Sequence, residues 1–208
     1  WALLRRSPAA APELQVSRDN DIALEPGRPS VLVAIAVLAI GLLFVCLHIA
    51  LYRAFNLFWT PFALPSMSLV WLGLGLFLLQ LVRRGGSSAL RSLLGAVAAL
   101  FVAKLVFFDA GSWRPDLDSL CYPYGWEAAA AGIRTFDYAL CIGLLALLFA
   151  RLRGSANSKT LAVSAGIGAL VLLFIFLTFE LNTALHRFLP GMRAGGLTLL
   201  WALYALGL

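Results

Sequence analysis

Long apolar runs separated by short polar segments dominate the chain from residue 31 onward. The first run, 31–52, carries no formal charge when its histidine is neutral. A helix rises about 1.5 Å per residue, so a run of about 20 residues crosses a bilayer core of about 30 Å. The pattern predicts membrane helices over 31–52, 64–82, 90–108, 133–150 and 160–181, with part of a sixth over 196–208. The expected fold class is therefore all-α, a polytopic transmembrane bundle with five full spans plus part of a sixth.

The segments between these runs differ in character. Residues 1–30 hold four prolines and mixed charges, which predicts a cytoplasmic linker or the end of a preceding helix. Residues 54–65 combine aromatic side chains with two prolines, which is typical of an interfacial loop. A longer loop, 109–132, contains the four aromatic residues Trp113, Tyr122, Tyr124 and Trp126. We expect these rings to hold the loop against the outer interface or a neighbouring protein.

Composition excludes an ordinary soluble domain. Hydrophobic residues make up 62% of the chain and charged residues 12%, whereas soluble domains carry roughly 25% charged residues. The net charge of +6 arises mostly from basic residues in short loops, so we expect a lipid bilayer and no nucleic acid as a partner. No zinc motif, phosphate-binding glycine loop or serine-nucleophile pattern occurs, and no cofactor is expected.

The basic residues also predict an orientation. Ten of them fall on one side of the predicted spans: Arg5, Arg6, Arg18, Arg28, Arg83, Arg84, Arg91, Arg151, Arg153 and Lys159. Five fall on the other side: Arg53, Arg114, Arg134, Arg187 and Arg193. Because cytoplasmic loops are enriched in Lys and Arg, the N-terminus is expected in the cytoplasm. The predicted location is the bacterial cytoplasmic (inner) membrane, with multiple passes.

A cluster of polar residues is predicted at the outer ends of the helices: Lys104, Asp109, Arg134, Glu180, Asn182, His186 and Arg193. Charged groups at membrane depth are costly and need partners. Glu180 is predicted to pair with Arg134 or Lys104, because all three share one depth.

Spacing suggests how the other charges are met. Lys104 and Asp109 are five residues apart and do not stack on one α-helical face, so partners across helices are expected. Arg134 and Asp137 are three apart and could pair locally.

Two interpretations of this cluster stay open. The favoured one is an interhelical ion network that fixes packing, and the other is an anion site or a proton path. A Glu180–His186 acid–base pair would need a bend between residues six apart. The catalytic residues, if any, are unknown.

The remaining candidates are weaker. Asp116 and Asp118 could hold a divalent cation, but a lone Asp-x-Asp is more often a solvated loop. Cys46 and Cys141 lie in apolar runs and are expected to act as small hydrophobic residues. Cys121 lies in the long loop, where a disulfide is conceivable without an assignable partner.

Several short motifs resemble one family of bacterial polytopic membrane proteins, domain of unknown function 2339. They are Glu180-Leu181-Asn182, Pro190 to Gly196, Leu200 to Ala205, Lys104 to Asp109 and Ile133 to Phe136. The resemblance covers roughly 88–208 and implies a helical fold and polar positions, because the family has no agreed activity. The loop 110–132 is longer than the family's usual connection, and the many preceding helices of family members are absent.

These observations give two expectations for function. The first is an integral-membrane scaffold or accessory subunit that docks with other membrane proteins or with a missing part of a longer chain. The alternative is a membrane enzyme or transporter with an outer-face site for an anionic or lipid-linked substrate. A scaffold would bury the charged groups in mutual pairs, whereas an enzyme or transporter would leave them lining a cavity. The chain begins at Trp1 and ends within an apolar run, so a fragment is expected.

Overall fold

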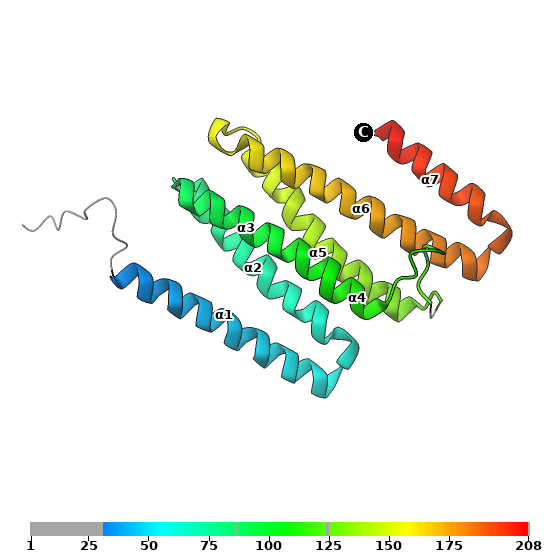
Figure 1. Ribbon diagram of the computed structural model, residues 1–208, viewed down its shortest axis with the longest axis horizontal. Helices are drawn as coiled ribbons and strands as arrows, with labels where there is room; N and C mark the ends of the chain where they lie inside the picture. Colours follow the sequence, from blue (N-terminus) through cyan, green and yellow to red (C-terminus); the bar gives the residue numbers. More distant parts are fainter. Residues whose placement is uncertain (1–30, 86, 124, 208) are drawn as a thin grey trace, which may run out of the picture. The chain divides into compact units, whose positions relative to one another are not determined.

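The computed structural model describes residues 31–85, 87–123 and 125–207. The chain divides into two compact units, 1–42 and 43–208, and the predicted linker 1–30 lies outside the described residues. Residues 31–42 are helical and form the start of α1. The second unit is a helical bundle whose described part contains no strand beyond one isolated bridge between Asp116 and Cys121 (Figure 1). The all-α prediction is confirmed.

The helices of the structure follow the predicted runs with different ends. The long helices are α1 (Val31–Phe58), α2 (Ala63–Arg83), α3 (Ser88–Lys104), α5 (Ala128–Leu152), α6 (Lys159–Phe188) and α7 (Arg193–Gly207). The short elements are η1 (Thr60–Phe62), η2 (Leu105–Asp109), α4 (Ala110–Trp113), η3 (Ala156–Ser158) and η4 (Pro190–Met192). Five helical stretches of the described chain are long and apolar enough to cross a membrane: Leu38–Phe58, Thr60–Arg83, Ser88–Trp113, Ala128–Leu152 and Ala156–Phe188. The protein is therefore a multi-pass membrane protein in contact with lipid.

The connections are shorter than the sequence predicts. Only Trp59 separates α1 from η1, so the interfacial loop expected at 54–65 is nearly all helix. Pro61 fits within η1 because the first turn of a helix leaves N–H groups unpaired in any case. The third span continues through η2 and α4, and α5 begins at Ala128. The loop predicted over 109–132 therefore reduces to 114–127.

The apolar core of the second unit lies between α2, α3, α5 and α6. Leu94, Phe101, Leu144 and Leu148 are completely buried there. Gly75 of α2 allows a close approach, since a Cβ at this position would lie 2.6 Å from Leu144 Cδ2. Such small residues are what let membrane helices pack tightly without a hydrophobic driving force.

Two helical hairpins of the chain are built to the same plan. The first hairpin is α1–η1–α2 and the second hairpin is α6–η4–α7. In both, one residue outside helical geometry leads into a three-residue 3₁₀ turn that contains proline, and the next helix follows directly. The bounds coincide after a shift of 130 residues, from 58 to 188 at the end of the first helix and from 63 to 193 at the start of the second.

Side-chain packing follows the same correspondence. In the first hairpin, Phe44 packs edge-on against Trp71 with ring centroids 5.0 Å apart. In the second, Phe174 and Trp201 occupy the corresponding positions, with centroids 6.3 Å apart. The two hairpins therefore share the positions of their turns and of one aromatic contact, and neither a shared long motif nor a composition bias in the sequence predicts this.

Candidate functional site

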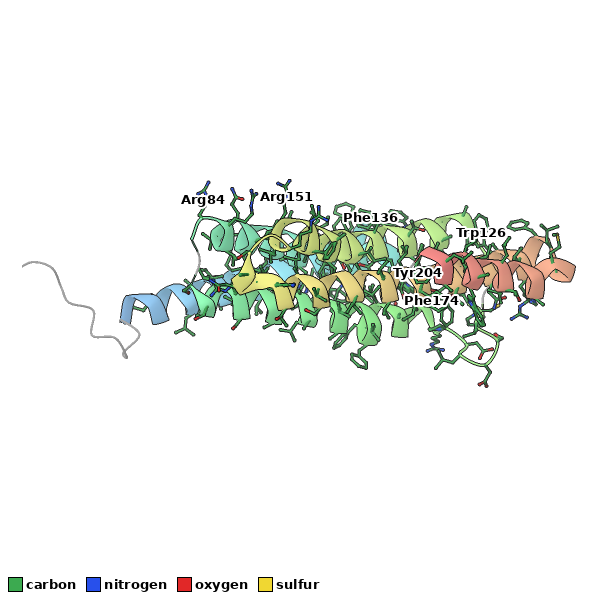
Figure 2. The ribbon with its side chains drawn as sticks, turned by 90° about the horizontal axis from the view of Figure 1, so that it is seen from above. Arg84, Trp126, Phe136, Arg151, Phe174 and Tyr204 are labelled. Carbon is green, nitrogen blue, oxygen red and sulfur yellow. The ribbon has the colours of Figure 1, made fainter. Side chains whose placement is uncertain are left out.

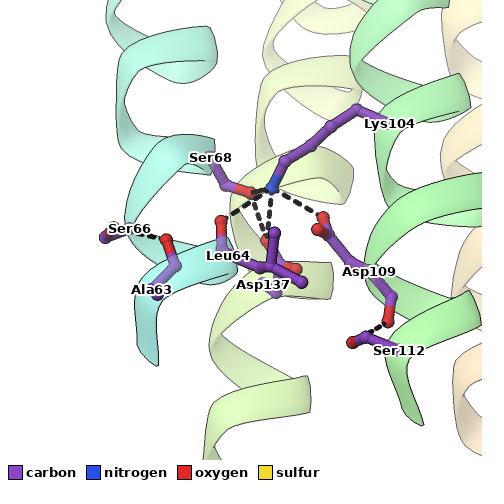
Figure 3. Close-up of polar contacts among 8 residues, drawn as sticks. All are labelled: Ala63, Leu64, Ser66, Ser68, Lys104, Asp109, Ser112 and Asp137. Atoms are coloured by element: carbon purple, nitrogen blue, oxygen red, sulfur yellow. Dashed lines mark hydrogen bonds and ion pairs between the residues drawn. The ribbon is translucent and has the colours of Figure 1, made fainter. Parts of the chain in front are cut away.

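A short π-helical segment shapes the polar interior. In η2 the backbone N–H of Ala110 donates to the carbonyl of Leu105, five residues earlier. A π-turn therefore places residues five apart above one another, which an α-helix does not. As a result Lys104 Nζ lies 2.6 Å from Asp109 Oδ2 within one segment (Figure 3). The expectation that these charges are met across helices is wrong for Asp109, which pairs with Lys104 within its own segment, because it assumed α-helical geometry.

Lys104 also binds two neighbouring helices. Its Nζ donates to the carbonyl of Leu64, 3.0 Å away, and to Ser68 Oγ, 2.6 Å away, both on α2. Its distance to Asp137 Oδ1 on α5 is 4.0 Å, and the Ser68 hydroxyl donates to that same carboxyl. We call Ser68, Lys104, Asp109 and Asp137 the Lys104 cluster. It joins α2, the third span and α5 at one buried point.

The contacts of Asp137 differ from the sequence expectation. Local pairing with Arg134, three residues earlier, does not occur, because Arg134 binds Glu180 on α6 and Asp137 binds Ser68 instead. Spacing on a helix shows that two residues could meet. The neighbouring helices decide which of several possible partners each one takes.

Arg134 and Glu180 form the second buried contact. The guanidinium donates through Nε to Oε1 and through Nη2 to Oε2, the latter over 3.2 Å. The side chains are only 5% and 12% exposed. The Tyr122 ring covers the guanidinium carbon at 3.9 Å, a cation–π arrangement. This two-point contact confirms the predicted pairing of Glu180 with Arg134.

Asn182 and Arg193 fix the loop 114–127 to the ends of α6 and α7. Asn182 Nδ2 donates to the carbonyls of Ser119 and Leu120, over 2.8 and 2.9 Å. Arg193 donates through Nε to Asn182 Oδ1 over 2.6 Å and through Nη2 to the carbonyl of Ser119. We call Ser119, Asn182 and Arg193 the loop anchor. It satisfies the backbone carbonyls of Ser119 and Leu120, next to the left-handed conformation of Leu120 with φ of 52°.

Aromatic side chains hold the same loop region on the bundle. Trp113 packs on Tyr138, Tyr122 on Phe179 and Trp126 on Phe188, with ring centroids 6.0, 5.7 and 5.3 Å apart. These three rings hold the loop region on α5 and α6 of the same chain. The predicted contact with the outer interface or a neighbouring protein stays a prediction. Tyr124 lies outside the described residues.

The acidic pair of the loop closes a turn. The Asp116 carboxylate accepts the Ser119 hydroxyl over 2.6 Å and the Asp118 N–H over 3.1 Å. The hydrogen bond from Ser119, followed by that from Asp118, holds the pKa of Asp116 below its usual range. Within the described ranges, no group of three or more His, Cys, Asp or Glu side chains could hold a metal ion.

His186 stands apart from the buried contacts. It is exposed near the end of α6 and, with Arg187, lines an open hollow of about 430 Å³ beside Cys121 and Tyr122. α6 continues unbroken through Glu180 and His186, so the bend that a direct contact would need is missing. The three cysteines are free, with Cys121 and Cys141 buried and Cys46 exposed.

Several residues of the site escaped sequence reasoning. Ser68 lies in an apolar run with no charged residue beside it. The Thr183 hydroxyl accepts the backbone N–H of Tyr122 over 3.1 Å, although nothing in the sequence around Thr183 distinguishes it from other helical residues. The only available signal was their polarity within runs that are otherwise apolar.

The loop anchor predicts a local effect. In Arg193→Gln the side chain is too short to reach both Asn182 and the Ser119 carbonyl, so we expect faster amide hydrogen exchange in 114–123 by at least about tenfold, the loss of about 1.4 kcal/mol. Mass spectrometry of exchange in detergent measures this. Arg187→Gln, at an exposed position near the end of α6, is the control. Unchanged exchange in Arg193→Gln would show that the aromatic contacts alone hold the loop.

Comparison with known proteins adds no relative: no family model matches the chain, and no significant match was found among curated proteins or solved structures. The buried charged groups bind one another. None of these contacts places a nucleophilic side chain beside a base that is not already engaged, as a catalytic site would need. Function therefore has to be inferred from how these groups are arranged.

Proposed function

We propose that the protein is a non-catalytic integral-membrane component, a scaffold or accessory subunit that docks with other membrane proteins. One observation carries this proposal. Lys104, Asp109, Arg134 and Glu180 contact one another in pairs, and their side chains are at most 12% exposed. Lys104 and Arg134 each border a hollow, but their charged ends are engaged in these pairs, which fix helices against each other.

The wider setting is part of the same proposal. The bacterial cytoplasmic membrane, an N-terminus in the cytoplasm and kinship of 88–208 with domain of unknown function 2339 agree with the loop charges and the short motifs. A scaffold needs a bundle with one fixed packing. Here specific polar contacts between the helices fix that packing, in addition to the apolar side chains.

One observation favours a second function, a membrane enzyme or transporter for an anionic or lipid-linked substrate. Two hollows open at the loop end of the bundle. His186 and Arg187 line the one of about 430 Å³, and Arg193, Asn182 and Asp118 line another of about 510 Å³. Basic groups around an open hollow suit an anion. Arg193 is already bound to Asn182 and Ser119, however, which leaves less of its charge for a ligand.

Extraction from native membranes distinguishes the two functions. We expect the protein, extracted in a mild detergent, to migrate with additional protein at a fixed stoichiometry, which light scattering corrected for bound detergent measures. A harsher detergent that strips the complex to a single chain serves as the control. A single chain in mild detergent that carries a tightly bound anionic lipid would contradict the scaffold proposal and support the alternative.

The proposed orientation has its own test. Arg84 and Arg151 lie toward one end of the bundle and Trp126 toward the other (Figure 2). We expect a membrane-impermeant thiol reagent to label Asp118→Cys from outside intact cells, and to label Arg84→Cys only after the membrane is opened. Unmodified protein is the control, since Cys121 and Cys141 are buried and Cys46 lies within the span Leu38–Phe58. Labelling with the opposite pattern would reverse the topology.

A further inference from the structure

The Lys104 cluster contains more carboxyl groups than its single amine can balance. Asp109 and Asp137 are fully buried, and Lys104 is the cation within salt-bridge distance of both, at 2.6 and 4.0 Å. If all three groups are ionised, one negative charge is left over in a region of low dielectric. An unbalanced buried charge is so costly that a protein normally neutralises it.

The hydrogen bonds of the cluster show which carboxyl oxygens share the excess negative charge. An ammonium has three protons, and Lys104 directs its own toward Asp109, Ser68 and the carbonyl of Leu64. The Ser68 hydroxyl satisfies Oδ1 of Asp137. Buried Oδ2 of Asp137 and both oxygens of Asp109 have no hydrogen-bond partner among the described residues, and Asp109 Oδ2 is met by the ion pair with Lys104. Each carboxyl thus presents one oxygen that has neither a hydrogen bond nor an ion pair.

The two carboxyls approach the same ammonium, which lies 2.6 Å from an oxygen of Asp109 and 4.0 Å from an oxygen of Asp137 (Figure 3). Two ionised carboxylates are both acceptors, so neither can donate a hydrogen bond to the other. A proton on either one turns that carboxyl into a donor. It would supply the missing hydrogen bond and remove the leftover charge in a single step.

We propose that Asp109 and Asp137 together bind one exchangeable proton at neutral pH, which makes the Lys104 cluster a buried proton-binding site. A metal cation is the poorer occupant, because the ammonium already lies within 4.0 Å of both carboxyls and would repel a second positive charge. The cluster then contains one ammonium, one carboxylate and one neutral carboxyl, with no net charge.

The nearby titratable side chains of α5 carry no charge that could balance the carboxyls. Tyr138 follows Asp137 directly and Cys141 lies one turn further along α5, and both are buried and ordinarily neutral. His48 of α1 lines, together with Lys104, an open hollow of about 430 Å³. Leu64, whose carbonyl binds Lys104, borders that hollow and also one of about 280 Å³ next to Arg134. One hollow thus reaches Lys104 itself, and the other reaches Leu64, which binds it.

Infrared spectroscopy of the purified full chain in detergent tests the proposal. We expect a carbonyl band of a protonated carboxyl at pH 7 that shifts in D₂O. The band should disappear in Asp137→Asn and also in Asp109→Asn, because Lys104 balances the one carboxylate that remains. Lys104→Met should raise its intensity about twofold, since both carboxyls then need a proton. Asp118→Asn, in the exposed loop, is the control and should change nothing.

Three results would overturn the proposal. A wild type without such a band would show that both carboxyls are ionised, and a band that both asparagine variants keep would come from a carboxyl outside the cluster. A band that sodium ions remove at constant pH would show that the site binds a cation instead. Ser68→Ala provides a check that leaves both carboxyls in place, because losing the hydroxyl should shift the band without abolishing it.

Discussion

Glu180→Gln is expected to lower the thermal stability of the protein in detergent by about 3–5 kcal/mol, the usual cost of removing one member of a buried ion pair. The glutamine preserves the shape of the side chain but leaves the Arg134 guanidinium without its counter-charge. Glu180 is only 12% exposed, so water replaces little of what is lost. Thermal unfolding followed by intrinsic tryptophan fluorescence measures the change.

A double variant separates the charge from the rest of the side chain. Arg134→Gln together with Glu180→Gln removes both charges, and we expect it to recover part of the stability lost in the single variant. Glu127→Gln is the matched control, because Glu127 is exposed at the start of α5. If Glu180→Gln unfolds at the wild-type temperature, the contact is not structural and the anion-site interpretation gains support.

Lys104→Met is expected to have an effect of similar size, about 3–5 kcal/mol, because it too breaks a buried pair. The amine holds α2, η2 and α5 together through Leu64, Asp109 and the serine–aspartate contact. Methionine fills comparable space in the apolar surroundings, so the loss reports on polar contacts rather than on a cavity. Detergent unfolding again provides the measurement.

The second site has its own partner and control. Adding Asp109→Asn to Lys104→Met should restore part of the stability, since the variant then has one fewer carboxyl to neutralise. Lys159→Met, at an exposed position, should remain within about 0.5 kcal/mol of wild type. If Lys104→Met and Lys159→Met lower the free energy of unfolding equally, the buried contacts of Lys104 contribute nothing specific to stability.

Sequence reasoning predicted the features that depend on apolar run length and on the cost of buried charge. The positions of the long helices and the pairing of Glu180 with Arg134 follow from these two rules. Helix ends were less predictable, because short 3₁₀ turns accommodate Pro61 and Pro190 without a loop. The aromatic residues near the loop were expected to contact the outer interface or a neighbouring protein, whereas three of them pack on α5 and α6 of the same chain.

The Lys104 cluster shows why the rest could not be predicted. Its geometry depends on a single π-turn, which changes which residues share a face and has no clear signature in an apolar run. Asp137 looked like a local partner of Arg134, and Ser68 looked like a neutral helix residue. Only the packing of three separate segments shows that they meet around one amine.

The repeated hairpins bear on symmetry. Between the end of α1 and the end of α6 the chain crosses the membrane four times, through the spans Thr60–Arg83, Ser88–Trp113, Ala128–Leu152 and Ala156–Phe188. An even number of crossings returns the chain to the same face, so both hairpins point the same way. An axis relating them would run along the membrane normal, as in parallel repeats, and not in the membrane plane, as in inverted repeats. In transporters with inverted repeats, the two repeats exchange conformations and so open the binding site to one side of the membrane and then to the other. This pair of hairpins, which point the same way, cannot work by that exchange.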